Sequence, residues 1–244
     1  MLDFYKQENI MSELHAEFVM CDIETLGTPR ECGTTFIAMP NAAFVAWQGF
    51  DVNPHVYYAQ FNVQDQLNAG AKVNARTVAF WLNEALRGNH AADLIVNALD
   101  EVDTESTTQF YAPLKVSEGF KESDSTVYDL LQEILSNYGN VPHYGNGPDF
   151  DQIIYSTVVA NVSKDTPEIW GFSQTSSART LKELYRDAGE NYQGLANESF
   201  EYAERVMKDT GYLEVGHTAS KHNPVFDALA EAFVVASIKQ YFLK

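Results

Sequence analysis

Two carboxylates, Asp22 and Glu24, end an apolar run that begins at Phe18. Side chains at positions i and i+2 of a strand point to the same face, so both carboxylates would project together from the strand's end. Like charges this close repel each other unless a cation lies between them. Gly27 follows and supplies a turn. The pair therefore predicts a divalent metal ion at the carboxyl edge of a sheet.

A third carboxylate, Asp151, follows the glycine-rich turn 145–148 at the start of an expected helix. Asp149 is predicted to cap this helix, where the helix dipole favours an anion. Asp151 lies on the same helix side as Ile154 and Val158, so we expect it to point toward the packed side. A buried carboxylate needs a partner, which makes Asp151 a candidate metal ligand.

A histidine and a fourth carboxylate flank the start of the last expected helix. Asn223 is a suitable cap and Pro224 favours the first helical position. His222 then lies on the approach loop and Asp227 in the first turns. From that loop the imidazole could reach over a metal ion bound by Asp227.

The elements that must position these residues form a mixed α/β pattern. Strands are predicted over 17–23, 35–47, 56–63 and 141–144, with the first three antiparallel. Helices are predicted over 74–86, 91–99, 125–138 and 177–188, from about 149 to beyond 159, and from 221 onward.

Composition limits the classes of protein that are possible. The 244 residues suffice for one domain, and the net charge of −18 argues against broad electrostatic attraction to nucleic acid. Two cysteines without metal-site spacing indicate a reduced cytoplasmic protein. No apolar run is long enough for a membrane helix, so no membrane partner is expected. We predict an N-terminal extension (1–15) and a single domain (16–244) with a polar insert near 100–124.

Taken together, the motifs resemble those of the DEDDh 3′-5′ exonucleases of the ribonuclease H-like superfamily. The matching segments are DIETLG with Asp22 and Glu24, GNGPDFD with Asp151, and HNPVFD with His222 and Asp227. Within that family the chain looks most similar to the exodeoxyribonuclease A branch of T-even phages and the mycobacterial-type exoribonucleases.

Two further segments support this resemblance, which spans about residues 17–238. The segment 76–81 resembles the Thr-x-x-x-Trp helix of that branch. The segment 176–181 resembles its D-x-R-T-L motif, with Ser177 where Asp is usual. The expected fold is accordingly α/β and ribonuclease H-like, a mixed β-sheet with helices on both faces.

The resemblance also implies the roles of the site residues. Asp22, Glu24 and Asp227 would bind the Mg²⁺ or Mn²⁺ ion that carries the attacking water, in agreement with the preference of these ions for oxygen ligands. Asp22 would bridge to a second ion supported by Asp151. His222 would be the general base, which must be neutral to accept a proton.

Candidate substrate-binding residues lie near these positions. They are Thr25 and Leu26 of the first motif, Asn146 of the glycine turn, Trp81 and Arg179. Trp81 could stack on a base, although its helical spacing favours the core. Arg179 could contact phosphate, although a solvated surface charge is the commoner role.

The predicted function is removal of nucleotides from the 3′ end of single-stranded nucleic acid, with DNA preferred and the oligomeric state left open. One alternative is a 3′-5′ exoribonuclease or oligoribonuclease acting on RNA. Another is a non-catalytic acidic binding protein. The five clustered acid and histidine positions argue against the last, because a binding protein has no physical need for them.

Overall fold

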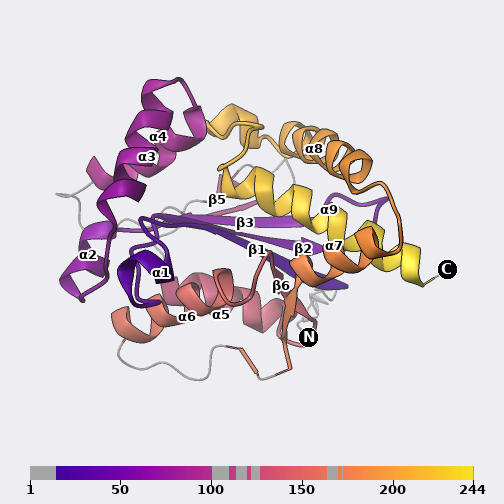
Figure 1. Ribbon diagram of the computed structural model, residues 1–244, viewed down its shortest axis with the longest axis horizontal. Coiled ribbons are helices and arrows are strands. Elements are labelled where there is room, and N and C mark those ends of the chain that lie inside the picture. The colour runs from indigo at the N-terminus through magenta and orange to yellow at the C-terminus, as the bar shows by residue number, and fades with distance from the viewer. Residues whose placement is uncertain are drawn as a thin grey trace, which may run out of the picture.

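A seven-stranded sheet crosses the middle of the molecule, as Figure 1 shows. The computed structural model describes residues 15–100, 110–113, 120–121, 127–163, 170–171 and 173–243. The strand order is β5-β4-β3-β2-β1-β6-β7. The bounds are Phe18–Glu24 (β1), Asn41–Trp47 (β2), His55–Gln60 (β3), Phe110–Pro113 (β4), Phe120–Lys121 (β5), His143–Gly145 (β6) and Thr175–Ser177 (β7).

Strand β1 occupies a central place between β2 and β6. It runs antiparallel to β2, which is antiparallel to β3, so the predicted antiparallel arrangement of the first three strands is confirmed. It runs parallel to β6, which is parallel to β7. The carboxyl ends of β1 and β6 therefore lie at the same edge of the sheet.

Helices cover both faces of the sheet, as predicted (Figure 1). Their bounds are Pro29–Cys32 (α1), Val63–Asn68 (α2), Ala75–Leu86 (α3), His90–Asp100 (α4), Val127–Tyr138 (α5), Asp151–Val162 (α6), Ala178–Asp187 (α7), Tyr192–Asp209 (α8) and Pro224–Phe242 (α9), with a 3₁₀ helix at Tyr212–Val215 (η2). Helices α5 and α6 pack on one face, and α8 and α9 on the other.

Alternation along β1 decides which face carries its two carboxylates. Val19 and Cys21 pack in the core on the α5–α6 side, whereas Phe18 and Met20 pack on the α8–α9 side. Residues two apart share a face, so Asp22 continues the second series and lies on the side of α9.

Side-chain caps explain where several predicted helices begin. Asn74 accepts hydrogen bonds from the backbone N–H groups of Arg76 and Thr77 and starts α3. Ser177 accepts one from Thr180 and starts α7. These are the positions at which the sequence predicted the two helices.

Two predicted strands are shorter in the structure. The strand expected over 35–47 begins only after Pro40, whose missing N–H cannot join a strand ladder. The strand expected over 56–63 ends at Gln60, because Asn62 caps α2 instead.

Other expectations need correction or stay predictions. Helix α8 was not predicted at all, and Asp149 does not cap α6, whose N-cap is Phe150 without a side-chain hydrogen bond. The extension 1–15 and the insert 100–124 lie mostly outside the described residues, although β4 and β5 within the insert extend the sheet beside β3. The division into an extension and one domain remains a prediction.

No helix among the residues that the structure describes is long and apolar enough to cross a membrane.

Candidate active site

Asp22 and Glu24 lie at the carboxyl end of β1, both partly buried. Burial raises the pKa of the Asp22 carboxyl well above its usual range, and the neighbouring carboxylates of Asp227 and Glu24 raise it further. The pKa of Glu24 is raised in the same way, first by burial and then by Asp227 and Asp151. Carboxylates from three separate elements therefore share one electrostatic environment.

Asp151 reaches this environment from the start of α6. Its side chain is 4% exposed, and its Oδ2 accepts a hydrogen bond from the Gly147 N–H at 3.3 Å. Burial raises the pKa of Asp151 to about 7, although backbone hydrogen bonds oppose the shift. A Cβ atom on Gly145 would lie 2.9 Å from Asp151 Oδ2, so β6 can approach this carboxylate closely only because it ends in glycine.

The loop before α9 places His222 beside Asp227. Asn223 caps α9 through hydrogen bonds from the N–H groups of Val225 and Phe226. His222 has a left-handed backbone with φ 71°, which is uncommon outside glycine. In this conformation its N–H donates to Asp227 Oδ2 at 2.7 Å.

The imidazole of His222 has an aromatic environment. Its ring lies edge-on to the rings of Phe80 and Trp81, with centroid distances of 5.5 and 5.6 Å. Burial lowers the pKa of His222, although Glu84 opposes the shift. Burial therefore favours the neutral imidazole, the form that a proton acceptor needs.

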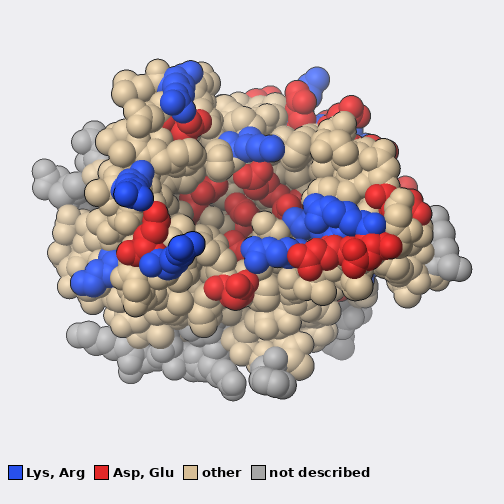
Figure 2. Space-filling view, viewed as in Figure 1, with Lys and Arg blue, Asp and Glu red and all other residues tan. Residues whose placement is uncertain are grey.

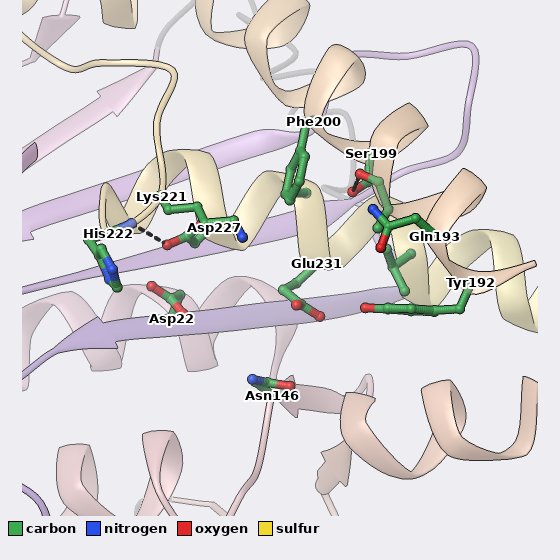
Figure 3. A pocket seen from close by; sticks show the side chains of 13 residues that line it. Asp22, Asn146, Tyr192, Gln193, Ser199, Phe200, Lys221, His222, Asp227 and Glu231 are labelled. Carbon is green, nitrogen blue, oxygen red and sulfur yellow. Dashed lines mark hydrogen bonds between the residues drawn. The ribbon is translucent and has the colours of Figure 1, made fainter. Parts of the chain in front are cut away.

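Asp22, His222 and Asp227 line a cavity of about 370 Å³, whose lining residues Figure 3 shows. Asp22, His222 and Asp227 lie together at one end of it, and Asn146 and Glu231 lie further along. Figure 2 shows acidic side chains inside a hollow on this face, with Lys and Arg side chains around it. A protein of net charge −18 thus presents cations beside its acidic cleft.

The donor set suits a divalent cation. One ligand atom each from Glu24, His222 and Asp227 lies within 4.8 Å of the others. The mutual repulsion of clustered carboxylates with raised pKa values would be relieved by a bound hard cation. The arrangement therefore fits the divalent metal that the sequence predicted.

Three of the predicted substrate-binding residues have buried side chains. Leu26 is fully buried, and the Thr25 hydroxyl donates to the Gly27 carbonyl at 2.7 Å. Trp81 is 3% exposed, and its indole N–H donates to the Thr25 carbonyl at 3.0 Å. These hydrogen bonds hold the segment that follows β1 in place. Direct contact of these side chains with substrate stays a prediction. The neighbouring Phe80 is 40% exposed and is open to a base.

The other two predicted residues, Asn146 and Arg179, come from the turn after β6 and the first turn of α7. The Arg179 N–H donates to the Asn146 carbonyl at 2.9 Å, which ties α7 to the turn after β6. The Arg179 side chain is exposed. Asn146 lines the cavity, and its Oδ1 accepts a hydrogen bond from Lys182 Nζ at 2.8 Å.

Sequence reasoning missed two charged residues of this region, Glu231 and Lys182. Glu231 follows Asp227 by four positions and thus shares its face of α9, a spacing that was visible in the sequence. Lys182 Nζ forms an ion pair with Glu231 at 2.7 Å. No sequence pattern pairs these two positions, because α7 and α9 meet only in the folded chain.

The sheet order and the acidic cleft at the end of β1 define a class of protein, the DEDDh exonucleases with a ribonuclease H-like fold. Residues 17–239 match the family model of the 3′-5′ exoribonuclease Rv2179c-like domain, and the chain belongs to this family. It is accordingly a phosphodiester hydrolase of the 3′-5′ exonuclease type. No curated protein is significantly similar to the chain in sequence. The family match favours RNA and does not support the predicted preference for DNA.

Proposed function

We propose that this chain is a divalent-metal-dependent 3′-5′ exoribonuclease that removes nucleotides one at a time from single-stranded RNA. The observation that carries the proposal is the clustering of four carboxylates and His222, which β1, α6, α9 and the loop before α9 bring together. The carboxylates are Asp22, Glu24, Asp151 and Asp227. The family match supports the direction of digestion and the choice of RNA.

The four carboxylates would bind two ions, Mg²⁺ or Mn²⁺, between them. When bound, such ions would stabilise the charge that develops on the attacking and leaving oxygens. The carboxylates must be deprotonated to bind metal, and their raised pKa values make that binding weaker as the pH falls.

His222 is the general base in this proposal. The oxygen of an attacking water bonds to the phosphorus while its proton passes to the neutral imidazole. The bond from phosphorus to the 3′-oxygen of the preceding nucleotide then breaks, and solvent protonates that oxygen. The hydrogen bond from the His222 N–H to Asp227 fixes the backbone that presents the ring.

The direct test uses matched 5′-labelled RNA and DNA, single- and double-stranded, with Mg²⁺, Mn²⁺ or EDTA. We expect stepwise shortening of single-stranded RNA that needs metal and is lost in Asp22→Asn. Glu204→Gln, which changes an exposed carboxylate on α8, is the matched control. If RNA with a free 3′ end is not shortened with either metal, the proposal is wrong. Comparing long RNA with short oligonucleotides then separates the exoribonuclease from an oligoribonuclease.

A further inference from the structure

A buried ion pair lies one helical turn beyond the catalytic carboxylates. Lys182 Nζ donates to both carboxylate oxygens of Glu231, at 2.8 and 2.7 Å, and to Asn146 Oδ1 at 2.8 Å. The Lys182 side chain is only 7% exposed, whereas that of Glu231 is 22% exposed. Asn146 and Glu231 line the cavity, so the lysine fixes two side chains that substrate can reach.

Lysine has three donor protons and no acceptor, and these three oxygens use all of them. Because lysine only donates, the Asn146 atom beside it must be the oxygen, which leaves the amide nitrogen free to donate elsewhere. A carboxylate accepts more hydrogen bonds than the two that Lys182 gives. Asn146 and Glu231 therefore form an oriented donor and acceptor pair beside the cavity.

The position of this pair follows from the course of α9. His222 precedes Asp227, and Glu231 follows it by one turn, so the two lie on opposite sides of Asp227, as Figure 3 shows. In an in-line displacement the leaving oxygen departs opposite the attacking water. If the attacking water lies on the side of His222, the leaving 3′-oxygen would point toward Glu231.

Aromatic residues of helix α8 line this part of the cavity. Phe200 stacks on Phe226, with centroids 5.7 Å apart, and lines the cavity with Tyr192. The Arg186 guanidinium lies 3.9 Å from the centre of the Tyr192 ring and fixes its position. Burial and the nearby Glu231 raise the pKa of Tyr192 to about 12, so its hydroxyl remains a donor. A nucleoside could pack its base here with its ribose toward Glu231.

We infer that Glu231 and Asn146 bind the ribose 2′-hydroxyl of the nucleotide that carries the leaving 3′-oxygen. This inference rests on the proposed function and names the group by which the enzyme would select RNA. The 2′-hydroxyl is vicinal to the leaving oxygen, donates to Glu231 and accepts from the Asn146 amide. DNA has a hydrogen in place of the 2′-hydroxyl, so Glu231 and the Asn146 amide would both lack a hydrogen-bond partner. A site built to bind a hydroxyl therefore binds DNA less well.

The first experiment changes the substrate and not the protein. Oligoribonucleotides carry a single 2′-deoxynucleotide at the 3′-terminal, penultimate or an interior position, and the rate of first cleavage is measured. We expect the penultimate substitution to slow cleavage about 10- to 100-fold, the effect of a lost hydrogen bond to a charged group. The terminal and interior substitutions should cost much less. Equal rates for all three would overturn the inference.

The second experiment couples the substrate change to Glu231→Gln. If Glu231 contacts the hydroxyl, the penultimate deoxy effect should shrink at least about threefold in this variant, because the partner has already been weakened. Glu204→Gln should retain the wild-type deoxy effect. Asn146→Ala should also reduce that effect, which provides a second variant if Glu231→Gln folds poorly.

Two results would overturn the inference without touching the proposed function. One is an unchanged deoxy effect in both folded variants. The other is an equal loss of RNA and DNA cleavage in Glu231→Gln together with weaker Mn²⁺ binding, which would assign Glu231 to the metal. Failure of the wild-type protein to shorten any RNA would instead contradict the proposed function itself.

Discussion

The two ends of the cleft are built by different means. At the His222 end, a left-handed backbone and a backbone hydrogen bond to Asp227 set the position of the ring. At the Glu231 end, the carboxylate is fixed by the side chain of Lys182. A backbone constraint fixes one geometry, as proton transfer requires. A side-chain ion pair can be changed by a single substitution, which suits the part of the site that selects among substrates.

The cost of each constraint also differs. A left-handed residue other than glycine costs about 1–3 kcal/mol, and such strain is concentrated at functional sites. Burying the Lys182–Glu231 ion pair removes both charges from water, and the free energy of this desolvation must be offset by the hydrogen bonds of the pair. The chain thus has backbone strain at the His222 end, where we propose the chemistry takes place. It has buried charge at the Glu231 end, where we propose the substrate is selected.

The largest effect should come from Asp227, which accepts the backbone hydrogen bond at the His222 end. Asp227→Asn keeps an acceptor for the His222 N–H but removes a charge from the acidic cluster. We expect the rate of RNA cleavage at saturating Mg²⁺ to fall about 10³-fold or more, as for removal of a key electrostatic group. Asp209→Asn, at the exposed end of α8, should cleave at the wild-type rate. A loss below tenfold in Asp227→Asn would show that this carboxylate is not essential.

The next largest effect is expected from a substitution at the His222 end. His222→Ala should slow cleavage about 10²- to 10⁴-fold, the usual contribution of a general base. Burial disfavours the protonated ring and lowers its pKa, so the wild-type rate should rise with pH to a plateau that begins near or below neutrality. The variant should lose that histidine-dependent rise. The same pH profile in both proteins would remove His222 from this role.

The fold and much of this end could be predicted from the sequence because the signals are local. Strand alternation placed Asp22 and Glu24 on one face, and Asn223 with Pro224 marked where α9 begins. The Glu231 end was not predictable in the same way. The spacing of Glu231 from Asp227 was visible in the sequence, but its partner Lys182 comes from a helix far away in the sequence. Helix α8 was missed because Gly194 and many charged residues obscure its apolar stripe.

A third prediction concerns Asp151, which is buried and accepts a backbone hydrogen bond from Gly147. Its pKa is about 7 in the folded protein, against roughly 3.9 in an unfolded chain. The folded state therefore binds this proton more tightly, and the stability it contributes is present at pH 4 and lost as the pH rises to 7. In EDTA, Asp151→Asn should melt several degrees above wild type at pH 8, with a smaller difference at pH 4.5.

Divalent metal provides the control for this comparison. It should raise the Tm of the wild-type protein more than that of Asp151→Asn at pH 8, because binding stabilises only the folded state. Equal melting temperatures of the two proteins in EDTA at both pH values would show that Asp151 carries no burial penalty.

The smallest effect should come from Lys182→Met, which keeps much of the aliphatic stem and removes the charge. Glu231 then loses its partner, and we expect a Tm lower by about 2–8 °C, since roughly 1–2 kcal/mol corresponds to this range in a domain of this size. Lys208→Met, exposed on α8, is the matched control. RNA cleavage should fall a few-fold and DNA cleavage less, because Glu231 remains present but is no longer oriented.

The double variant Lys182→Met/Glu231→Leu should recover stability, because no buried charge is left unpaired. It should not recover selectivity for RNA, because the acceptor is gone. Recovery of both would mean that this end of the cleft serves packing alone, and the contrast between the two ends would then be one of construction and not of function.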